Sequence, residues 1–217
     1  MQLTDAIYGA PPVDLGLIDL SPVEMMFWLY CPIKLAGQLH VTMPPNLEQF
    51  GALVDAVARD SRTWKSSYIY ITAKTLFTTP ENPGNRPGWH SDGFLTDDLN
   101  YIWADANPTI FWEPDIRFRF PADHNASLGQ MEAVADTHPN EHRTYPVKHL
   151  LRLDQTVLHK VDTKITPGLR TFVKISVSRH RYALRGNSIN HHLAPDWTYQ
   201  ARQTERNCPI GEAPHDH

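Results

Sequence analysis

The segment LHKVDTKITPGLRTFVKISV, residues 158–177, is the part of the sequence that most strongly indicates the fold. Both ends of the segment are rich in β-branched and aromatic residues, which favour strands. Pro167-Gly168 between them is a typical turn. Residues 156–161 and 171–177 are therefore expected to be strands that run antiparallel to each other.

Shorter runs of the same kind recur earlier in the chain, separated by turns rich in proline and glycine. They are residues 67–72, 99–103 and 109–112. One helix is expected, from an N-cap at Asn46 to about Asp60, because apolar residues recur there at helical spacing. The run 22–31 is a short helix or a strand, and its periodicity does not decide between them. A helix followed by many short strands predicts a mainly β fold with flanking helices, a sandwich or jelly roll.

The 217 residues suit one domain with a sizeable core. We expect residues 1–65 to form a helical or irregular N-terminal extension that packs on a core of residues 66–185. Residues 186–217 are polar and are expected to be a C-terminal tail. Within the core, residues 121–146 are also polar and are expected to be a long excursion that shapes a pocket.

Composition and cysteine use restrict the class of protein. Twenty Lys and Arg against 24 Asp and Glu give a net charge of −4, which disfavours broad affinity for nucleic acid phosphates. The longest apolar run, 25–30, is far below the roughly 20 residues that span a bilayer. Cys31 and Cys208 form no CxxC motif, and no secretory signal is apparent. We therefore expect a cytoplasmic protein with reduced thiols and no membrane partner.

The triplet His90-Ser91-Asp92 is the first element of a candidate metal site. Residues i and i+2 of a strand share a face, so His90 and Asp92 can present an imidazole and a carboxylate together. With 12 histidines in the chain, about one His-x-Asp triplet is expected by chance. The triplet gains weight from His159, in the first strand of the opening segment, and from Arg170, just past its turn. Two histidines and one carboxylate bind non-haem Fe(II), and a guanidinium binds a carboxylate through two parallel hydrogen bonds.

In these four residues and their order, the chain resembles the iron(II)/2-oxoglutarate-dependent dioxygenases. Their signature is a His-x-Asp motif, a distal histidine and an arginine a short distance beyond it. The resemblance extends over roughly residues 66–180 and implies a double-stranded β-helix, which is a form of jelly roll. It also implies that His90, Asp92 and His159 hold Fe(II) and that Arg170 pairs with the C5 carboxylate of 2-oxoglutarate, the cosubstrate.

The reaction implied by this resemblance is hydroxylation of an unidentified substrate, with release of succinate and CO2. We expect a small-molecule substrate, with a nucleic acid or a protein as alternatives. A hydroxyl group, from Thr171 or from Tyr70 on a facing strand, is a further candidate contact for 2-oxoglutarate.

Two alternatives stay open at this point. His191 or His192 with Arg202 repeats the spacing of His159 with Arg170, although the surrounding segment is poorer strand material. The chain could also be a jelly-roll module that binds a metal or a sugar without oxygenase activity. The two functions differ structurally, because an oxygenase needs the guanidinium inside the barrel and an open cavity that reaches the metal.

Overall fold

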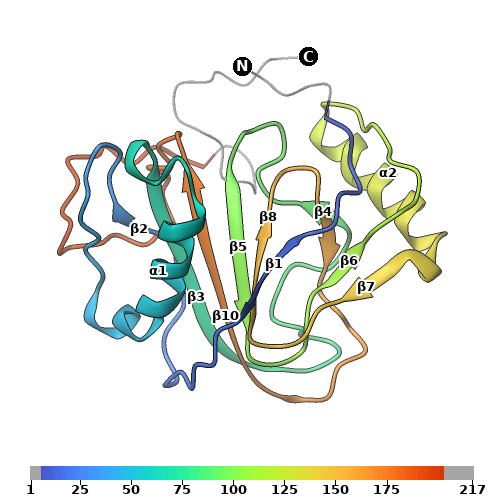
Figure 1. Cartoon of the computed structure of the whole chain (residues 1–217), viewed down its shortest axis with the longest axis horizontal. Coiled ribbons are helices and arrows are strands. Elements are labelled where there is room, and N and C mark those ends of the chain that lie inside the picture. The colour runs from blue at the N-terminus through green and yellow to red at the C-terminus, as the bar shows by residue number, and fades with distance from the viewer. Residues whose placement is uncertain (1–5, 203–217) are drawn as a thin grey trace.

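Two facing antiparallel β-sheets make up the protein (Figure 1), for which we use a computed structural model that describes residues 6–202. The strands of the large sheet are β1 (Val13–Leu17), β2 (Trp28–Lys34), β3 (Tyr68–Thr78), β5 (Leu99–Ala104), β8 (His149–Leu153) and β10 (Gly168–Ser178). The strands of the small sheet are β4 (His90–Ser91), β6 (Ile110–Trp112), β7 (His142–Thr144) and β9 (Leu158–Lys160). Their spatial orders are β1-β8-β5-β10-β3-β2 and β4-β9-β6-β7.

The connections from β3 to β10 define the fold. The chain passes from one sheet to the other after every strand in this stretch, except between β6 and β7. With β3 taken as strand one of this set, the two sheets have the orders 6-3-8-1 and 2-7-4-5. This order is that of a jelly roll, in which two Greek keys wind around one core. The mainly β, jelly-roll fold predicted from the sequence is confirmed.

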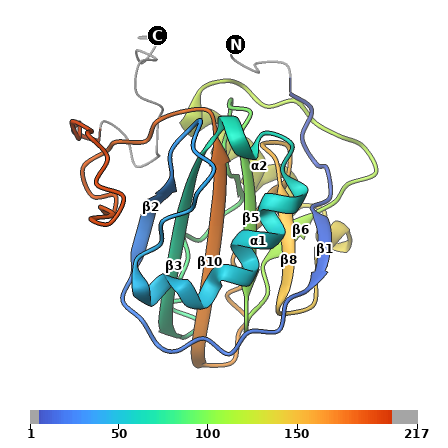
Figure 2. The ribbon, with the colours of Figure 1, turned by 60° about the vertical axis from the view of Figure 1, so that its left-hand side comes forward.

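Helix α1 (Gly51–Asp60) covers the outer face of the large sheet (Figure 2). Its buried residues Leu53, Val54 and Val57 share one apolar cluster with Val173, Ile175 and Val177 of β10. Side chains alternate along a strand, so the even-numbered residues of β10 project between the two sheets instead. This alternation assigns Arg170, Phe172 and Lys174 to the inner face of the barrel.

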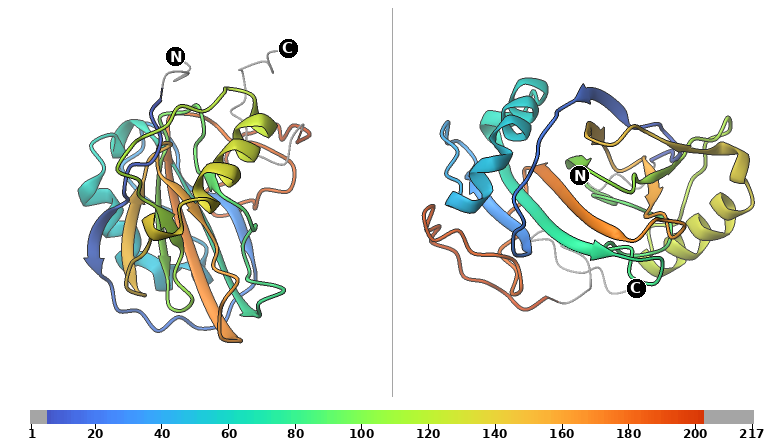
Figure 3. Two further views of the ribbon diagram at one scale, coloured as in Figure 1. Left: turned by 90° about the vertical axis from the view of Figure 1, so that its right-hand side faces the viewer. Right: turned by 90° about the horizontal axis from the view of Figure 1, so that it is seen from below.

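Helix α2 (His124–Asp136) covers the small sheet and lies on the opposite side of the molecule from α1 (Figure 3). The Asp123 carboxylate caps the helix by accepting a hydrogen bond from the Ala126 amide at 2.7 Å. Met131 and Ala135 pack in a cluster with Trp112 of β6. The two helices thus occupy the outer faces, which leaves the space between the sheets for a site.

The expectation of a long excursion at residues 121–146 is corrected by the structure. This stretch contains α2, the short 3-10 helix η3 (Pro139–Glu141) and β7, a strand of the jelly roll itself. The buried side of α2 consists of Ser127, Met131 and Ala135. Only one of these three is a large apolar residue, so the segment gives almost no periodic signal in the sequence.

The N-terminal part of the chain is more strand-like than the sequence indicates. β1 and β2 lie at the two edges of the large sheet, and the undecided run 22–31 leads into β2. Asn46 is not an N-cap, because a 3-10 helix, η1 (Pro45–Phe50), precedes α1 and has no side-chain cap. Pro45 presets the backbone for that first turn. A second 3-10 helix, η2 (Trp64–Ser66), leads into β3.

The described part of the C-terminal tail runs beside β2. The Ser188 amide donates a hydrogen bond to the Leu29 carbonyl at 2.7 Å, and the Asn190 side chain donates to the Pro32 carbonyl at 2.9 Å. Cys31 is buried in β2 with a free thiol, and Cys208 lies outside the described residues. No helix within residues 6–202 has the length and apolar character needed to cross a bilayer.

The packing of β10 against α1 predicts the effect of truncating Ile175. This side chain is fully buried, so Ile175→Ala should lower the free energy of unfolding by about 2–5 kcal/mol, measured by urea denaturation. Ile116 is 74% exposed, so Ile116→Ala is the matched control and should stay within about 0.5 kcal/mol of wild type. Equal losses in the two variants would contradict this assignment of the core.

Candidate metal centre

The pairing of β4 with β9 brings two histidines together. His90 and His159 are direct partners in the antiparallel register, so their side chains leave the same face of the small sheet. Their ring centroids are 4.5 Å apart. The chain turns immediately after β4, and Asp92 lies in that turn next to Gly93, which has a φ of +69°. Glycine suits this position because a positive φ is unfavourable for other residues.

Each imidazole is held by a backbone carbonyl two residues before it. The Nδ1 atom of His90 lies 2.9 Å from the Gly88 carbonyl, and that of His159 lies 3.3 Å from the Val157 carbonyl. A carbonyl can only accept, so each Nδ1 donates a proton to it, and Nε2 is the ring nitrogen that can serve as a metal ligand. Metal-binding histidines are commonly oriented in this way.

Helix α2 fixes the backbone just before His90. The Trp89 indole donates a hydrogen bond to the Asp136 carboxylate, and the Trp89 amide donates one to the Glu132 carboxylate, both at 2.8 Å. Trp89 is 1% exposed. The helix missed by the sequence analysis therefore takes part in positioning the first metal-ligand candidate.

Asp92 completes the cluster and forms an ion pair with Lys174. The Lys174 ammonium lies 3.1 Å from both oxygens of the Asp92 carboxylate. Burial alone would raise the pKa of Asp92, but the positive charge of Lys174 outweighs burial and holds that pKa below its usual range. Burial and the neighbouring His90 lower the pKa of His159 to about 3. His159 is thus a neutral imidazole and Asp92 a carboxylate, the protonation states in which these groups bind a metal.

The donor set fits a divalent iron. One ligand atom each from His90, Asp92 and His159 can be chosen so that all three lie within 4.8 Å of one another. Two imidazole nitrogens and one carboxylate on one side, with open space opposite, is the arrangement of non-haem Fe(II) oxygenases. The structure brings together the three residues predicted from the sequence as metal ligands.

A second cluster, of Asp97, Asp98 and His180, is less suited to a metal. The Asp98 carboxylate already accepts hydrogen bonds from the hydroxyls of Ser178 and Tyr182, both at 2.5 Å. Asp97 pairs with Arg179 at 3.5 Å on the surface. These partners account for the acidic groups without an ion.

A cavity of about 360 Å³ opens between the sheets at the cluster. Four cationic residues line it, namely Lys74, Arg86, Lys174 and Arg202. Among the described residues that line it, Asp92 is the only carboxylate. Aromatic rings form much of the rest of the wall: Phe27, Tyr30, Phe94 and Phe172. The surroundings of the cluster therefore suit an anionic ligand with an apolar part.

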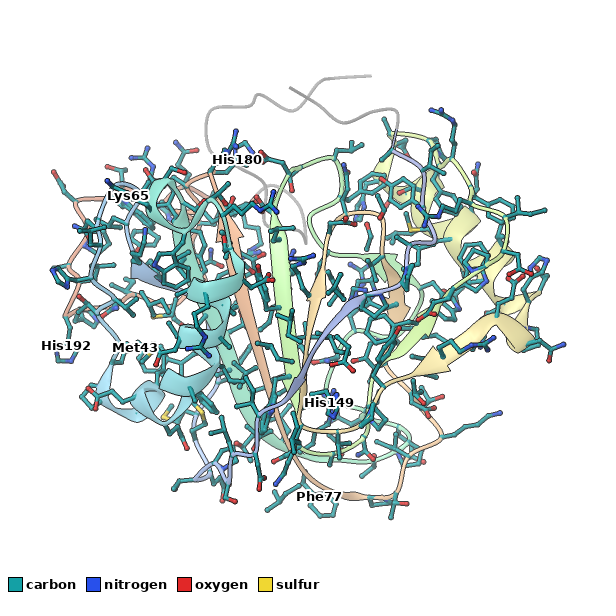
Figure 4. The ribbon with its side chains drawn as sticks, in the orientation of Figure 1. Met43, Lys65, Phe77, His149, His180 and His192 are labelled. Atoms are coloured by element: carbon teal, nitrogen blue, oxygen red, sulfur yellow. The ribbon has the colours of Figure 1, made fainter. Side chains whose placement is uncertain are left out.

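Arg170 lies on the inner face of the barrel but does not line this cavity. Its side chain is buried, with the guanidinium carbon 5.1 Å from the centre of the Phe172 ring. Its Nε donates to the carbonyls of Ala106 and Asn107, at 2.9 and 3.1 Å. Figure 4 shows Phe77, the register partner of Leu169, at the lower end of the large sheet, so Arg170 belongs to that end.

The two hydroxyl groups expected near the cosubstrate are engaged elsewhere. Thr171 is an odd-numbered residue of β10 and projects from the other face of the sheet, where its hydroxyl lies 3.1 Å from that of Thr75. The Tyr70 hydroxyl donates to the His180 carbonyl and accepts from the Tyr182 amide, both at 3.0 Å. Neither residue lines the cavity, so the structure does not support these two assignments.

The alternative histidines do not join the cluster. His191 and His192 are exposed, and Figure 4 shows His192 at the left edge of the molecule, away from β4. Arg202 does line the cavity, where it donates a hydrogen bond to Asn187 at 2.6 Å. The structure thus separates Arg202 from the histidines that precede it.

Sequence reasoning missed the two lysines of the cavity. Lys74 and Lys174 lie in strand-like runs, where a lysine is usually read as the solvent side of a strand. The available signal is the alternation along β10, because Lys174 shares a face with Arg170. Its contact with Asp92 depends on the packing of the two sheets, which the sequence does not show.

The cluster predicts which histidine is needed for metal. His159→Ala removes one of three ligands and should lower the affinity for Mn(II) at least about tenfold, measured by calorimetric titration. His192→Ala is the matched control and should bind Mn(II) as wild type does. Loss of binding in the His192 variant alone would instead favour the alternative pair with Arg202.

Comparisons with known proteins give structural relatives only. No protein-family model matches the chain, and no curated protein sequence matches it. Seven chains of known structure do match. One is an oxidoreductase of the 2OG-Fe(II) oxygenase family from Burkholderia pseudomallei, with a TM-score of 0.39 and 12% identity over 74% of this chain and 68% of that chain. Another is EvdO2 from Micromonospora carbonacea var. aurantiaca, with a TM-score of 0.33 and 12% identity over 62% of this chain and 60% of that chain.

Proposed function

We propose that this chain is an Fe(II)- and 2-oxoglutarate-dependent dioxygenase that hydroxylates a small organic substrate. The observation that carries the proposal is the position of the His90, Asp92 and His159 side chains on the wall of an open cavity inside a jelly roll. A structural metal site is closed by its protein ligands, whereas a catalytic site keeps coordination positions free. The open cavity at this cluster therefore favours catalysis.

The reaction balances without any further reagent. A substrate C–H bond, O2 and 2-oxoglutarate give the hydroxylated product, succinate and CO2. Iron would supply the activation of O2, which no protein side chain can perform. The chain's own residues bind the two organic reactants, orient them and exclude water.

The cavity walls contribute orientation and shielding. Phe172 and Tyr30 present rings to the cavity, and Lys174 lies 5.4 Å from the centre of the Tyr30 ring. Apolar walls exclude water and strengthen each charge interaction inside. A volume of about 360 Å³ suits a small metabolite together with a cosubstrate, which supports a small molecule over a nucleic acid or protein substrate.

The binding-module alternative has less support. Such a module requires either a closed metal site or an outward-pointing Arg170, and Arg170 is 2% exposed on the inner face. A binding site for a neutral sugar would not need several cations around a single carboxylate. The charge of the cavity therefore suits organic acids better than sugars.

Anaerobic spectroscopy tests the proposed function. Adding 2-oxoglutarate to the Fe(II)-loaded protein should produce a weak metal-to-ligand charge-transfer band in the visible range, since a 2-oxo acid that chelates Fe(II) gives such a band. Asp92→Asn keeps the shape of the side chain but removes its charge, so this variant should lose the band along with tight iron binding. Absence of the band in wild-type protein that has bound Fe(II) would refute the proposal.

A further inference from the structure

The buried and half-buried lysines of the protein differ in how many of their N–H donors already have an acceptor. Lys34 is a reference for a structural lysine, because its ammonium donates to three carbonyls, those of Leu35, Lys65 and Ser67. An ammonium has three donors, so Lys34 is saturated. Lys174 is engaged with Asp92 at 3.1 Å. Lys34 therefore has no donor left for a ligand, whereas Lys174 keeps one donor but has its charge already paired with the Asp92 carboxylate.

Lys74 on β3 is different. Its ammonium donates to one carbonyl, that of Gly84. It otherwise faces aromatic rings, with Nζ 5.3 Å from the centre of Phe27 and 5.8 Å from that of Phe172. Within residues 6–202 no carboxylate forms an ion pair with it. Lys74 therefore offers up to two donors and one uncompensated charge to the cavity it lines.

The electrostatic surroundings of Lys74 also favour an anion. Burial, followed by the positive charges of Arg170 and Lys174, lowers the pKa of Lys74 to about 8. Lys74 is thus repelled by two nearby cations, and Asp92, which already pairs with Lys174, is the only carboxylate among the described residues that line the cavity. An anion bound at Lys74 would relieve both the desolvation and the repulsion.

Arg170 is poorly placed to compete for such an anion. Along the inner face of β10 the order is Arg170, Phe172, Lys174, and only the last two line the cavity. One Arg170 nitrogen, Nη2, has no hydrogen-bond partner among the described residues and is fully buried. The Phe172 ring packs on the guanidinium, so a ligand in the cavity meets Phe172 and Lys74 before it can reach Arg170.

We propose that Lys74, rather than Arg170, binds the second carboxylate of the 2-oxoglutarate cosubstrate. This inference rests on the proposed function. The register places Lys74 opposite Phe172, and Thr72 opposite Lys174. Lys74 is thus two residues along β3 from the level of Asp92 and its ion pair, a distance of about 7 Å along the strand. A five-carbon dicarboxylate that chelates the metal through one end can place its other end at that level.

The test compares two 2-oxo acids that differ in one carboxylate. Mn(II)-loaded protein, which does not turn over, is titrated with 2-oxoglutarate and with 2-oxopentanoate, which has the same carbon chain without the second carboxylate. Wild type should bind 2-oxoglutarate about 10- to 100-fold more tightly. Lys74→Met should remove most of this preference and leave the affinity for 2-oxopentanoate unchanged.

Two further variants serve as controls. Lys74→Arg keeps a cation and should keep most of the preference. Arg170→Met should keep it too if it folds, which its thermal unfolding shows. If that variant does not fold, Arg170→Lys, which keeps the charge, is used in its place. Loss of the preference in the Arg170 variant, with retention in Lys74→Met, would overturn the inference and leave the proposed function intact. Failure of wild type to bind either acid when Mn(II) is bound would refute both.

Thermal stability provides a second readout. A ligand-binding lysine that is partly desolvated near other cations contributes little to the fold, so Lys74→Met without ligand should unfold at the same temperature as wild type or higher. Lys34→Met is the structural comparison and should unfold at a lower temperature, because three carbonyls lose their donor. A Lys74→Met variant as destabilised as Lys34→Met would show a structural role and overturn the inference.

Discussion

The pairing of β9 with β4 on one side and β6 on the other is the constraint on which the rest of the site depends. β4 has two residues and gains its place from β9 alone within the small sheet. The register sets His159 opposite both His90 and Phe111. A shift of one residue would turn one histidine to the outer face of the sheet. The hydrogen bonds from α2 to Trp89 therefore help to hold this short strand in register.

The ion pair of Asp92 with Lys174 lets the fold hold a buried carboxylate, which an apolar core would not favour. Asp92 and Lys174 are both removed from most solvent, and such a pair contributes little net stability once the cost of desolvation is included. A divalent cation bound to Asp92 would balance part of the carboxylate charge that Lys174 balances now. An anionic cosubstrate would then offset the added positive charge, so the metal and the anion are expected to bind more tightly together than separately.

Strand alternation in the sequence relates His90 to Asp92, but His159 was joined to them through the resemblance to a known family, because the pairing of β4 with β9 is not local. The sequence was not sufficient to decide which inner-face residue of β10 reaches the cavity. Arg170 has the expected spacing from His159, but Phe172 lies between it and the cavity wall. Alternation along β10 could have placed Lys174 on the inner face, but not its contact with Asp92, and no sequence feature marked Lys74 as facing the cavity. Helix α2 was missed because its buried residues are mostly small.

The origin of the cavity wall explains why the substrate is harder to predict than the chemistry. The metal-ligand candidates come from β4, β9 and the turn after β4, all within the eight strands of the jelly roll. Phe27 comes from the segment before β2, Asn85 and Arg86 from the loop between β3 and β4, and Leu128 from α2. These segments lie outside those eight strands, and the two that are loops can vary without disturbing the register of the two histidines, whereas α2 also holds β4 through Trp89. The strands thus hold the candidate metal centre, and the added segments shape the cavity that a ligand would enter.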